Sequence, residues 1–463
     1  MKKSCKFLCT TLALLAFFTS CGEKENRTAE YQEPESVPVA VTESVGETET
    51  ESVAEKSMPP EIIACTSGKD AISGTRFYLL CGKVESAGTV TITGGNIDTI
   101  SQYTGRTRFF IPVYGPMNKN LNIQITFTAD GKTESDPLTY QIEKARDRID
   151  FANFSIGKGN NFVHWPDWVN YACANYMSRS SLESTYNMLV KRNQRIKDAC
   201  GDDTRFIIML APDPMVMYDE SVNDEVAQMR RDGIEQYNAR SGHEDIDPDA
   251  PIYTAMNEIA DYVVEQDPDF TMIDMTPILK ELKQEETYPR LYHTTDNHWS
   301  SLGAYYGYRE IMNVIYEQTG NEGTKPLELT DFDIVDYELT FANMAGFTDP
   351  WSLGICEVVD LLVPKIERTA KLTSGEILND GRFWSDVQHP MTFEKEGDLP
   401  TVVFLRDSFA TSMYPMLNEH FSWAYYGETW NYGVDYDWLA EVDPDYVIII
   451  AVERLAMSAL QQR

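Results

Sequence analysis

Val402-Val403-Phe404-Leu405-Arg406-Asp407-Ser408-Phe409-Ala410 is a short apolar run that ends at a serine. Its length and nearly continuous hydrophobicity predict a strand buried on both faces of a sheet. A sharp turn from that strand into a helix would expose the Ser408 hydroxyl and aim backbone N–H groups at one point, as in an oxyanion hole. The stretch lacks the G-x-S-x-G pattern of α/β-hydrolases. Ser408 is therefore either a nucleophile or the cap of the following helix.

The segments on either side of this strand alternate between apolar strands and amphipathic helices. Strands are expected at 206–210, 270–275 and 446–451, and helices at 182–196, at 256–263 and from about residue 301. This alternation predicts an α/β domain over residues 146–463, with a mostly parallel sheet covered on both faces. An irregular insertion is expected within it, at about 320–398.

A second polar motif, Thr295-Asp296-Asn297-His298-Trp299-Ser300, stands just before the third expected helix. An Asp two residues before a His can accept the Nδ1 proton and leave Nε2 as an outward-facing base. Ser300 or Ser301 can cap the helix. Asp-x-His also occurs often by chance. The two residues could instead be polar surface residues or metal ligands. Open α/β sheets place ligands at strand ends, which is where both motifs are expected.

Together the two motifs, in this order and spacing, resemble the DHHW and alginate O-acetyltransferase (AlgJ/AlgX-type) group of SGNH-hydrolase-like proteins, over roughly residues 150–460. The resemblance implies a three-layer α/β/α fold. It also implies a triad, with Ser408 as nucleophile, His298 as general base and Asp296 as the residue that orients the base. Asn297 stands where the DHHW group has its first histidine, so this chain keeps only the second one.

Three further residues are secondary candidates for contact with substrate: Trp299, Asp407 and Arg454. Arg454 falls where relatives carry an arginine near the site. Trp299 would either shield the base from water or pack against the helix start, and packing is the favoured interpretation. Asp407 would organise the serine turn through backbone hydrogen bonds rather than act chemically.

Residues 59–145 have a different pattern, made of short alternating runs. The clearest is a hairpin in which Ile123, Ile125 and Phe127 alternate, Asp130-Gly131 turns the chain, and Leu138, Tyr140 and Ile142 alternate back. This predicts a small all-β module, sandwich-like, preceding the α/β domain. The module holds no cluster of His, Asp and Ser, so a spacer or glycan-contact role is expected. Cys65 and Cys81 could pair as a disulfide.

The first 21 residues have a basic start and a short apolar core, which predicts a signal peptide. Cys21 stands where a bacterial lipoprotein is cleaved and acylated. Residues 22–58 are rich in Glu, Thr, Ser and Val and predict a disordered acidic linker. The formal net charge of −34 disfavours binding to nucleic acid. We therefore expect an extracytoplasmic protein anchored by lipid to the bacterial cell membrane.

The expected function is O-acyl transfer, most simply O-acetylation, to an extracytoplasmic polysaccharide through a serine acyl-enzyme. The resemblance implies that a membrane-bound acyltransferase or donor protein supplies the acetyl groups, and that no metal or other cofactor is needed. A carbohydrate esterase would use the same residues with water as the acceptor. A non-catalytic surface-binding lipoprotein is the alternative from another class.

Overall fold

The computed structural model describes most of the chain beyond its first 53 residues. The described residues are 54–144, 154–160, 162–164, 170–172, 176–239, 245–284, 290–339, 357–376 and 389–462. The predicted signal peptide with Cys21 lies outside them, as do residues 22–53 of the predicted linker. Within the described ranges, no helix is long and apolar enough to span a membrane.

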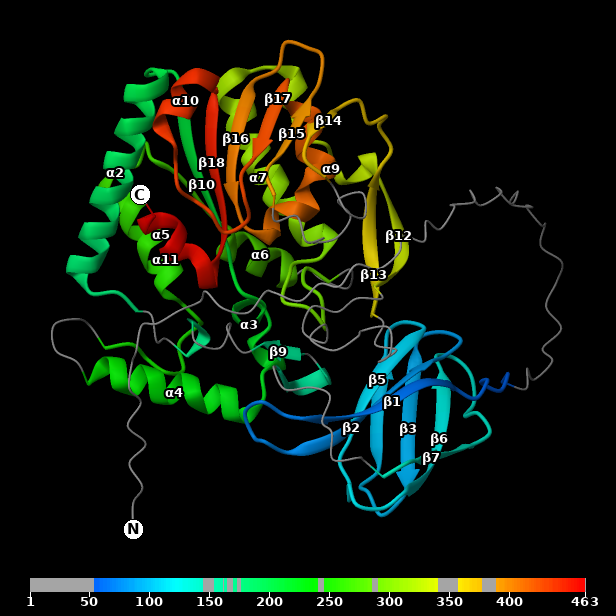
Figure 1. Cartoon of the computed structure of the whole chain (residues 1–463). Coiled ribbons are helices and arrows are strands. Elements are labelled where there is room, and N and C mark those ends of the chain that lie inside the picture. The colour runs from blue at the N-terminus through cyan, green and yellow to red at the C-terminus, as the bar shows by residue number, and fades with distance from the viewer. Residues whose placement is uncertain are drawn as a thin grey trace, which may run out of the picture. The chain divides into compact units, whose positions relative to one another are not determined.

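An all-β region forms the first part of the described chain (Figure 1). Its strands are β1 (Glu61–Lys69), β2 (Arg76–Lys83), β3 (Gly88–Gly94), β4 (Ile100–Thr104), β5 (Arg108–Val113), β6 (Leu121–Ala129) and β7 (Leu138–Ile142). One antiparallel sheet has the order β1-β2-β5 and the other the order β4-β3-β6-β7. Leu80 and Ile111 of the first sheet and Ile125 and Phe127 of the second are buried in one hydrophobic cluster. The two sheets therefore pack face to face, as the alternating pattern predicts.

The predicted hairpin of this region is confirmed, whereas the disulfide considered between Cys65 and Cys81 is not formed. β6 pairs antiparallel with β7, and Gly131 has a φ of 77° in the connection, which glycine adopts without steric cost. Neither cysteine is part of a disulfide bond. Cys65 is paired in register with Leu80, the neighbour of Cys81, so the two sulfur atoms point to opposite faces of the sheet. Burial raises the pKa of Cys65 to about 12.

Residues 54–58, which composition assigns to the linker, instead belong to the folded part. Ser57 is buried. Its N–H donates to the Thr133 carbonyl at 2.9 Å, and its hydroxyl accepts the Ala129 N–H at 2.8 Å. These partners lie more than seventy residues further along the chain. The composition of residues 54–58 therefore cannot reveal their contact with residues 129–133.

A seven-stranded mixed sheet lies at the centre of the α/β part (Figure 1). Its strands are β10 (Arg205–Ala211), β11 (Thr271–Asp274), β14 (Lys371–Ser374), β15 (Met391–Glu394), β16 (Thr401–Arg406), β17 (Trp423–Tyr426) and β18 (Tyr446–Val452). The order is β11-β10-β18-β16-β17-β15-β14. Neighbouring strands are parallel from β11 to β17, and the edge strands β15 and β14 are antiparallel. The antiparallel pairing of β15 with β17 and of β14 with β15 makes the sheet mixed. A two-stranded antiparallel ribbon, β8 (Phe154–Ile156) with β9 (Phe162–His164), precedes it in the chain.

Helices pack against the central sheet through two hydrophobic clusters. The α-helices are α2 (Arg179–Cys200), α3 (Pro214–Met217), α4 (Asp224–Asn238), α5 (Ala255–Gln266), α6 (Met275–Gln284), α7 (Ser301–Thr319), α9 (Tyr414–Leu417), α10 (Tyr436–Val442) and α11 (Glu453–Gln461). Met209 of β10 joins the cluster that contains residues of α6 and α7, whereas its neighbours Ile208 and Leu210 join the cluster of α2, α5 and α11. Because successive side chains of a strand point to opposite faces, the sheet is covered on both.

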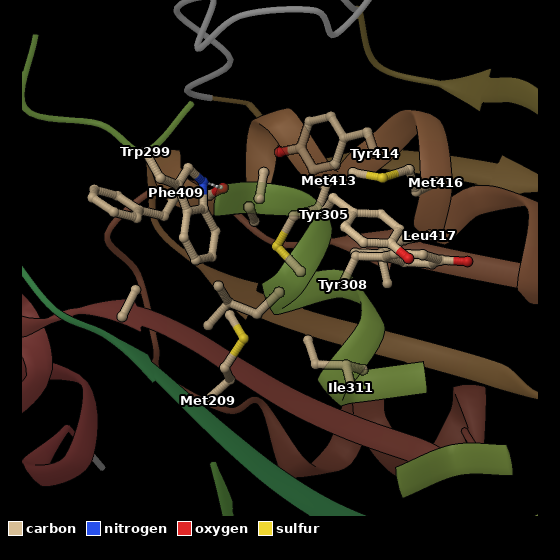
Figure 2. Close-up of a cluster of buried hydrophobic side chains, with 14 of the residues drawn as sticks. Met209, Trp299, Tyr305, Tyr308, Ile311, Phe409, Met413, Tyr414, Met416 and Leu417 are labelled. Carbon is tan, nitrogen blue, oxygen red and sulfur yellow. Dashed lines mark hydrogen bonds between the residues drawn. The ribbon is translucent and has the colours of Figure 1, made fainter. Parts of the chain in front are cut away.

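Helix α7 lies close against the loop that precedes it. A Cβ added at Gly303 would come within 2.4 Å of the Leu291 carbonyl oxygen, and one at Gly307 within 2.7 Å of the Trp299 ring. Trp299 is fully buried between this helix and Phe409, as Figure 2 shows. The two glycines therefore let the helix and the loop pack in direct contact, which fixes the position of the second motif.

Part of the segment that the pattern left as an irregular insertion, about 320–398, is regular. It contains the antiparallel pair β12 (Phe332–Leu339) and β13 (Glu357–Pro364), together with β14 and β15 of the central sheet. The exposed strand β14 carries no buried residue, so its sequence lacks the apolar alternation that identifies a strand. The described part of the insertion therefore extends the domain instead of interrupting it.

Candidate active site

Three neighbouring parallel strands end at one edge of the sheet and carry polar residues there. Asp407 and Ser408 follow β16, Glu453 and Arg454 follow β18, and Asp213 lies just past the end of β10. Because β10, β18 and β16 are adjacent and parallel, their carboxyl ends lie side by side. Open α/β sheets bind ligands at such an edge.

The turn that carries Ser408 is held by Asp407, whose side chain is fully buried. Its Oδ1 accepts the Phe409 N–H at 2.8 Å, and its Oδ2 accepts the Val452 N–H at 2.6 Å. The Tyr432 hydroxyl donates to the same Oδ2 at 3.0 Å. Burial raises the pKa of Asp407, against these hydrogen bonds. Asp407 follows β16 and bonds the N–H of Val452 in β18, so it connects the two strands. Its bond to the Phe409 N–H fixes the turn.

Ser408 begins a 3₁₀ helix (Ser408–Met413), which α9 continues, rather than a regular α-helix. Asp407, not Ser408, is the N-cap of this helix. The Ser408 side chain is therefore not used as a cap, and the residue remains partly exposed. The N–H of Phe409, the residue after Ser408, donates to Asp407.

The second motif lies in a loop closed by a bridge between Tyr292 and Trp299. The Ser300 N–H donates to the Leu291 carbonyl at 2.8 Å, and the Ser300 hydroxyl accepts the Gly303 N–H at 3.3 Å. Ser300 thus caps α7, as the motif predicts. The bridge and the Ser300 bond close the loop, and they hold Asp296 and His298 between them.

The structure brings Asp296, His298 and Ser408 together. Asp296 Oδ1 lies 2.6 Å from His298 Nδ1 and also accepts the His298 N–H at 2.9 Å. His298 Nε2 lies 2.7 Å from Ser408 Oγ, although the two residues are 110 positions apart. Asp296 and His298 are buried. With the proton held on Nδ1 by Asp296, Nε2 can accept the Ser408 hydroxyl proton, which is the arrangement of an activated serine nucleophile.

Glu357, at the start of β13, holds the residues just before Asp296. Its Oε1 accepts the N–H and hydroxyl of Thr294 at 2.8 and 2.7 Å. Its Oε2 accepts the same two groups of Thr295 at 3.0 and 2.8 Å. Sequence reasoning missed this residue, because it lies in the segment taken as an irregular insertion. No local signal identifies it, since its partners are about sixty residues away.

Trp299 is enclosed by protein, and its polar atom is used within the fold. The indole N–H donates to the Phe409 carbonyl at 2.9 Å, the dashed line in Figure 2. The Phe409 ring also lies 5.2 Å from the His298 ring, centroid to centroid. Trp299 and Phe409 therefore connect the loop of the base to the turn of the serine, which matches the packing role favoured for Trp299.

Arg454 lies next to the serine turn, in contact with buried acidic groups. Its guanidinium pairs with Asp213 Oδ1 at 2.5 Å and lies 5.5 Å from the centroid of the Phe409 ring. Glu453 Oε2 accepts the Asp213 N–H at 2.9 Å. Desolvation and the neighbouring Asp213 charge raise the pKa of Glu453 to about 8. Sequence reasoning proposed Arg454 as a site residue and gave no role to Asp213 or Glu453, because their contacts join the ends of two different strands.

Comparison with known proteins identifies the part of the chain that contains Asp296 and His298. Residues 254–380 match the family model described as an SGNH hydrolase-like domain, acetyltransferase AlgX. Ser408 lies beyond the matched segment. Among curated proteins, none matches the chain.

Several solved structures resemble the fold at low sequence identity. Bacillus cereus PatB1 with a sulfonyl adduct is 15% identical, with a TM-score of 0.44 over 65% of this chain and 94% of PatB1. A DHHW family protein from Eubacterium siraeum is 15% identical, with a TM-score of 0.41 over 73% of this chain and 92% of its own. The O-acetyltransferase domain of Pseudomonas putida AlgJ is 12% identical, with a TM-score of 0.37 over 67% and 93%.

The segment that holds the base is thus similar in sequence to the SGNH hydrolase-like domain of the acetyltransferase AlgX.

Proposed function

We propose that the chain is an extracytoplasmic O-acetyltransferase that modifies a polysaccharide through an acetyl-serine at Ser408. The observation that carries the proposal is the hydrogen-bonded series Asp296–His298–Ser408, which ends at a partly exposed serine residue at the sheet edge. A buried carboxylate behind an imidazole and a serine in front of it form the unit that transfers acyl groups in unrelated folds. The family match supports acetyl as the group transferred.

The first half-reaction loads the serine. Ser408 Oγ attacks the carbonyl carbon of an acetyl ester, and its proton passes to His298 Nε2. The tetrahedral intermediate then collapses, and the leaving oxygen of the donor takes that proton from Nε2. Asp296 keeps the imidazole in the required tautomer and stabilises the imidazolium while it exists. The product is an ester between the acetyl group and Ser408.

The second half-reaction unloads the serine. A sugar hydroxyl attacks the acetyl carbonyl and gives its proton to His298 Nε2. The proton is then returned to Ser408 Oγ as the serine leaves. If water takes the place of the sugar hydroxyl, the same steps give a carbohydrate esterase. Transfer therefore differs from hydrolysis only in which hydroxyl reaches the acetyl-serine first.

Activated esters and oligosaccharides separate these functions. With p-nitrophenyl acetate the chain should release nitrophenol and carry acetyl on Ser408, detected by mass spectrometry of the peptide. An oligosaccharide acceptor should then speed turnover and appear as an acetylated sugar. The reason is that loading requires only the activated serine, whereas unloading by transfer requires a bound acceptor.

Two other results would assign a different function. If adding acceptor changes neither the turnover rate nor the products, the chain is an esterase. If no Ser408 adduct forms with any activated ester, it is a non-catalytic binding protein.

We also propose that Cys21 carries lipid and anchors the protein at the outer face of the cell membrane. A membrane-bound acyltransferase would then supply acetyl groups at the same surface. Radioactive palmitate fed to expressing cells should label the chain, and Cys21→Ala should not be labelled. Cys5→Ala, which changes another cysteine of the same leader segment, should be labelled like the parent. Equal labelling of parent and Cys21→Ala would contradict the anchor.

A further inference from the structure

Arg106 lies in the turn between β4 and β5 of the all-β region and bonds to the α/β part of the chain. The two parts belong to one compact unit. Arg106 Nη2 lies 2.7 Å from both carboxylate oxygens of Asp360, and Nη1 lies 2.6 Å from Asp336 Oδ1. The side chains of Arg106 and Asp360 are only 21% and 12% exposed. Ion pairs that form a network and are partly shielded from water are weakened least by salt. This contact therefore joins the turn to the β12–β13 pair.

The β12–β13 pair depends on this cation, because its two acidic residues lie directly opposite one another. Asp336 of β12 is the register partner of Asp360 of β13. Like charges at directly opposed positions destabilise a strand pair, and a two-stranded pair is at best marginally stable by itself. In the described part of the chain β12 and β13 pair with no further strand. Arg106 bonds to both carboxylates, so it replaces their repulsion with a shared attraction to one positive charge.

The two ends of the β12–β13 pair are held by different contacts. At one end, Phe332 and Leu362 belong to the hydrophobic cluster that contains residues of α7, and the Leu362 N–H donates to the Ser301 hydroxyl at 3.1 Å. At the other end β13 begins with Glu357, which precedes Asp360 by a strand length of about 10 Å. Arg106 therefore supports the half of the pair that carries Glu357.

Glu357 connects the β12–β13 pair to the loop of the base. Its two carboxylate oxygens accept the N–H and hydroxyl groups of Thr294 and Thr295, at distances between 2.7 and 3.0 Å. The next residue, Asp296, bonds both the Nδ1 and the N–H of His298. An unbroken series of hydrogen bonds and peptide bonds thus runs from the turn of the all-β region, through β13, to the imidazole that faces the serine.

We propose that the all-β region is a positioning part of the active site: Arg106 holds the β12–β13 pair, and Glu357 of that pair holds the loop that carries Asp296 and His298. The proposal rests on the proposed acyl transfer at Ser408. It gives the all-β region a role beyond the spacer or glycan contact expected from its sequence. Arg106 and Glu357 act through other residues, so both are positioning residues.

The first test is hydrogen–deuterium exchange of the full chain, measured by mass spectrometry on peptides that cover residues 290–300. Glu357→Gln should speed exchange there, because an amide offers one acceptor oxygen to four donor groups. Arg106→Ala should also speed it, by about twofold to thirtyfold, although its ion pairs are with the β12–β13 pair. The matched control is Lys132→Ala, which removes a cation of the all-β region whose partners, Glu55 and Glu85, lie in the same region. This control should exchange like the parent.

Reversing the ion pair provides a rescue. Arg106→Asp should speed exchange of the loop more than Arg106→Ala, because three carboxylates then meet at the β12–β13 pair. Asp360→Arg added to Arg106→Asp should return the exchange toward that of the parent, since opposite charges again join the turn to the strands.

The second test is acetylation of Ser408 by p-nitrophenyl acetate. Glu357→Gln should lower the rate constant of loading by up to about 10²-fold, with the half-saturating ester concentration unchanged, because a displacement of about 1 Å can cost that much. Arg106→Ala should lower it by a smaller factor. In a His298→Ala background neither change should lower the residual rate further, because both residues act through the base.

The outcomes separate this proposal from the proposed function. Thermal unfolding midpoints show whether each variant is folded, and Arg106→Lys, which keeps the charge without the planar fork, is used where Arg106→Ala is not. Parent-like loop exchange or parent-like loading in folded Arg106 and Glu357 variants would overturn the proposal, and so would an equal effect of Lys132→Ala. An absent Ser408 adduct in the parent would remove the proposed function. The loop exchange of the Arg106 variants would then still support or overturn the connection from the all-β region to the loop.

Discussion

Ser408→Ala should lower the rate of p-nitrophenyl acetate turnover by about 10²–10⁴-fold, to the level left by binding and transition-state stabilisation alone. The hydroxyl 2.7 Å from His298 Nε2 is the atom that forms the acyl bond. Without it, only water can attack the ester. The Ser408 adduct should disappear at the same time. The measurement is initial nitrophenol release at saturating ester, with enzyme-free hydrolysis subtracted.

The loss of turnover rate should not become larger when His298 is replaced together with Ser408. His298→Ala alone should cost a similar factor, and the double variant should be close to either single one, because the groups act as a unit. Ser412→Ala, four residues further along the same 3₁₀ helix, should keep the parent rate, and so should His389→Ala, an exposed histidine. Rates that fall multiplicatively in the double variant would mean that Ser408 and His298 act in separate steps or sites.

Trp299→Ala should lower the free energy of unfolding of the α/β part by about 3–5 kcal/mol. The side chain is fully buried and packs against Phe409 and the close approach at Gly307. Its removal leaves a cavity that α7 cannot fill without moving, and it leaves the Phe409 carbonyl without its indole donor. Urea unfolding followed by far-ultraviolet circular dichroism measures the change.

The matched control is Trp430→Ala. Trp430 is 46% exposed, so its truncation should change the same free energy by less than about 1 kcal/mol. Trp299→Phe should fall between parent and Trp299→Ala, because it keeps most of the packing but not the hydrogen bond. If Trp299→Ala unfolds at the same urea concentration as Trp430→Ala, Trp299 is not part of the connection between the loop and the turn.

The parts of the site that the sequence predicts are those fixed by local pattern. An apolar strand ending at Ser408 and an Asp-x-His pair before a helix are each readable within ten residues. Parallel strands then bring their ends to one edge, so the serine and the histidine meet without further information. The resemblance to a known family also predicted, from the sequence alone, that the two motifs form one site.

The parts that the sequence does not predict depend on pairing across long distances. Glu357 begins the largely buried strand β13, and it holds Thr294 and Thr295, whose positions about sixty residues earlier in the chain give no local sign of the contact. Burial first, and then the charge of Asp213 at the end of another strand, raise the pKa of Glu453 to about 8. Cys65 and Cys81 are near in sequence but point apart, since one residue of register decides the face.

The central strand β18 is among the last parts of the sheet to be synthesised. This strand enters the sheet between β10 and β16, both of which precede it in the chain, and its Val452 N–H holds Asp407 beside the serine. Because synthesis delivers the N-terminal side first, the pairing of β10 and β16 with β18 waits until residues 446–452 are made. A chain interrupted before that point has its serine and histidine but no shaped turn. We therefore expect chains that end before Val452 to lack the proposed activity, because the N–H that holds Asp407 is missing.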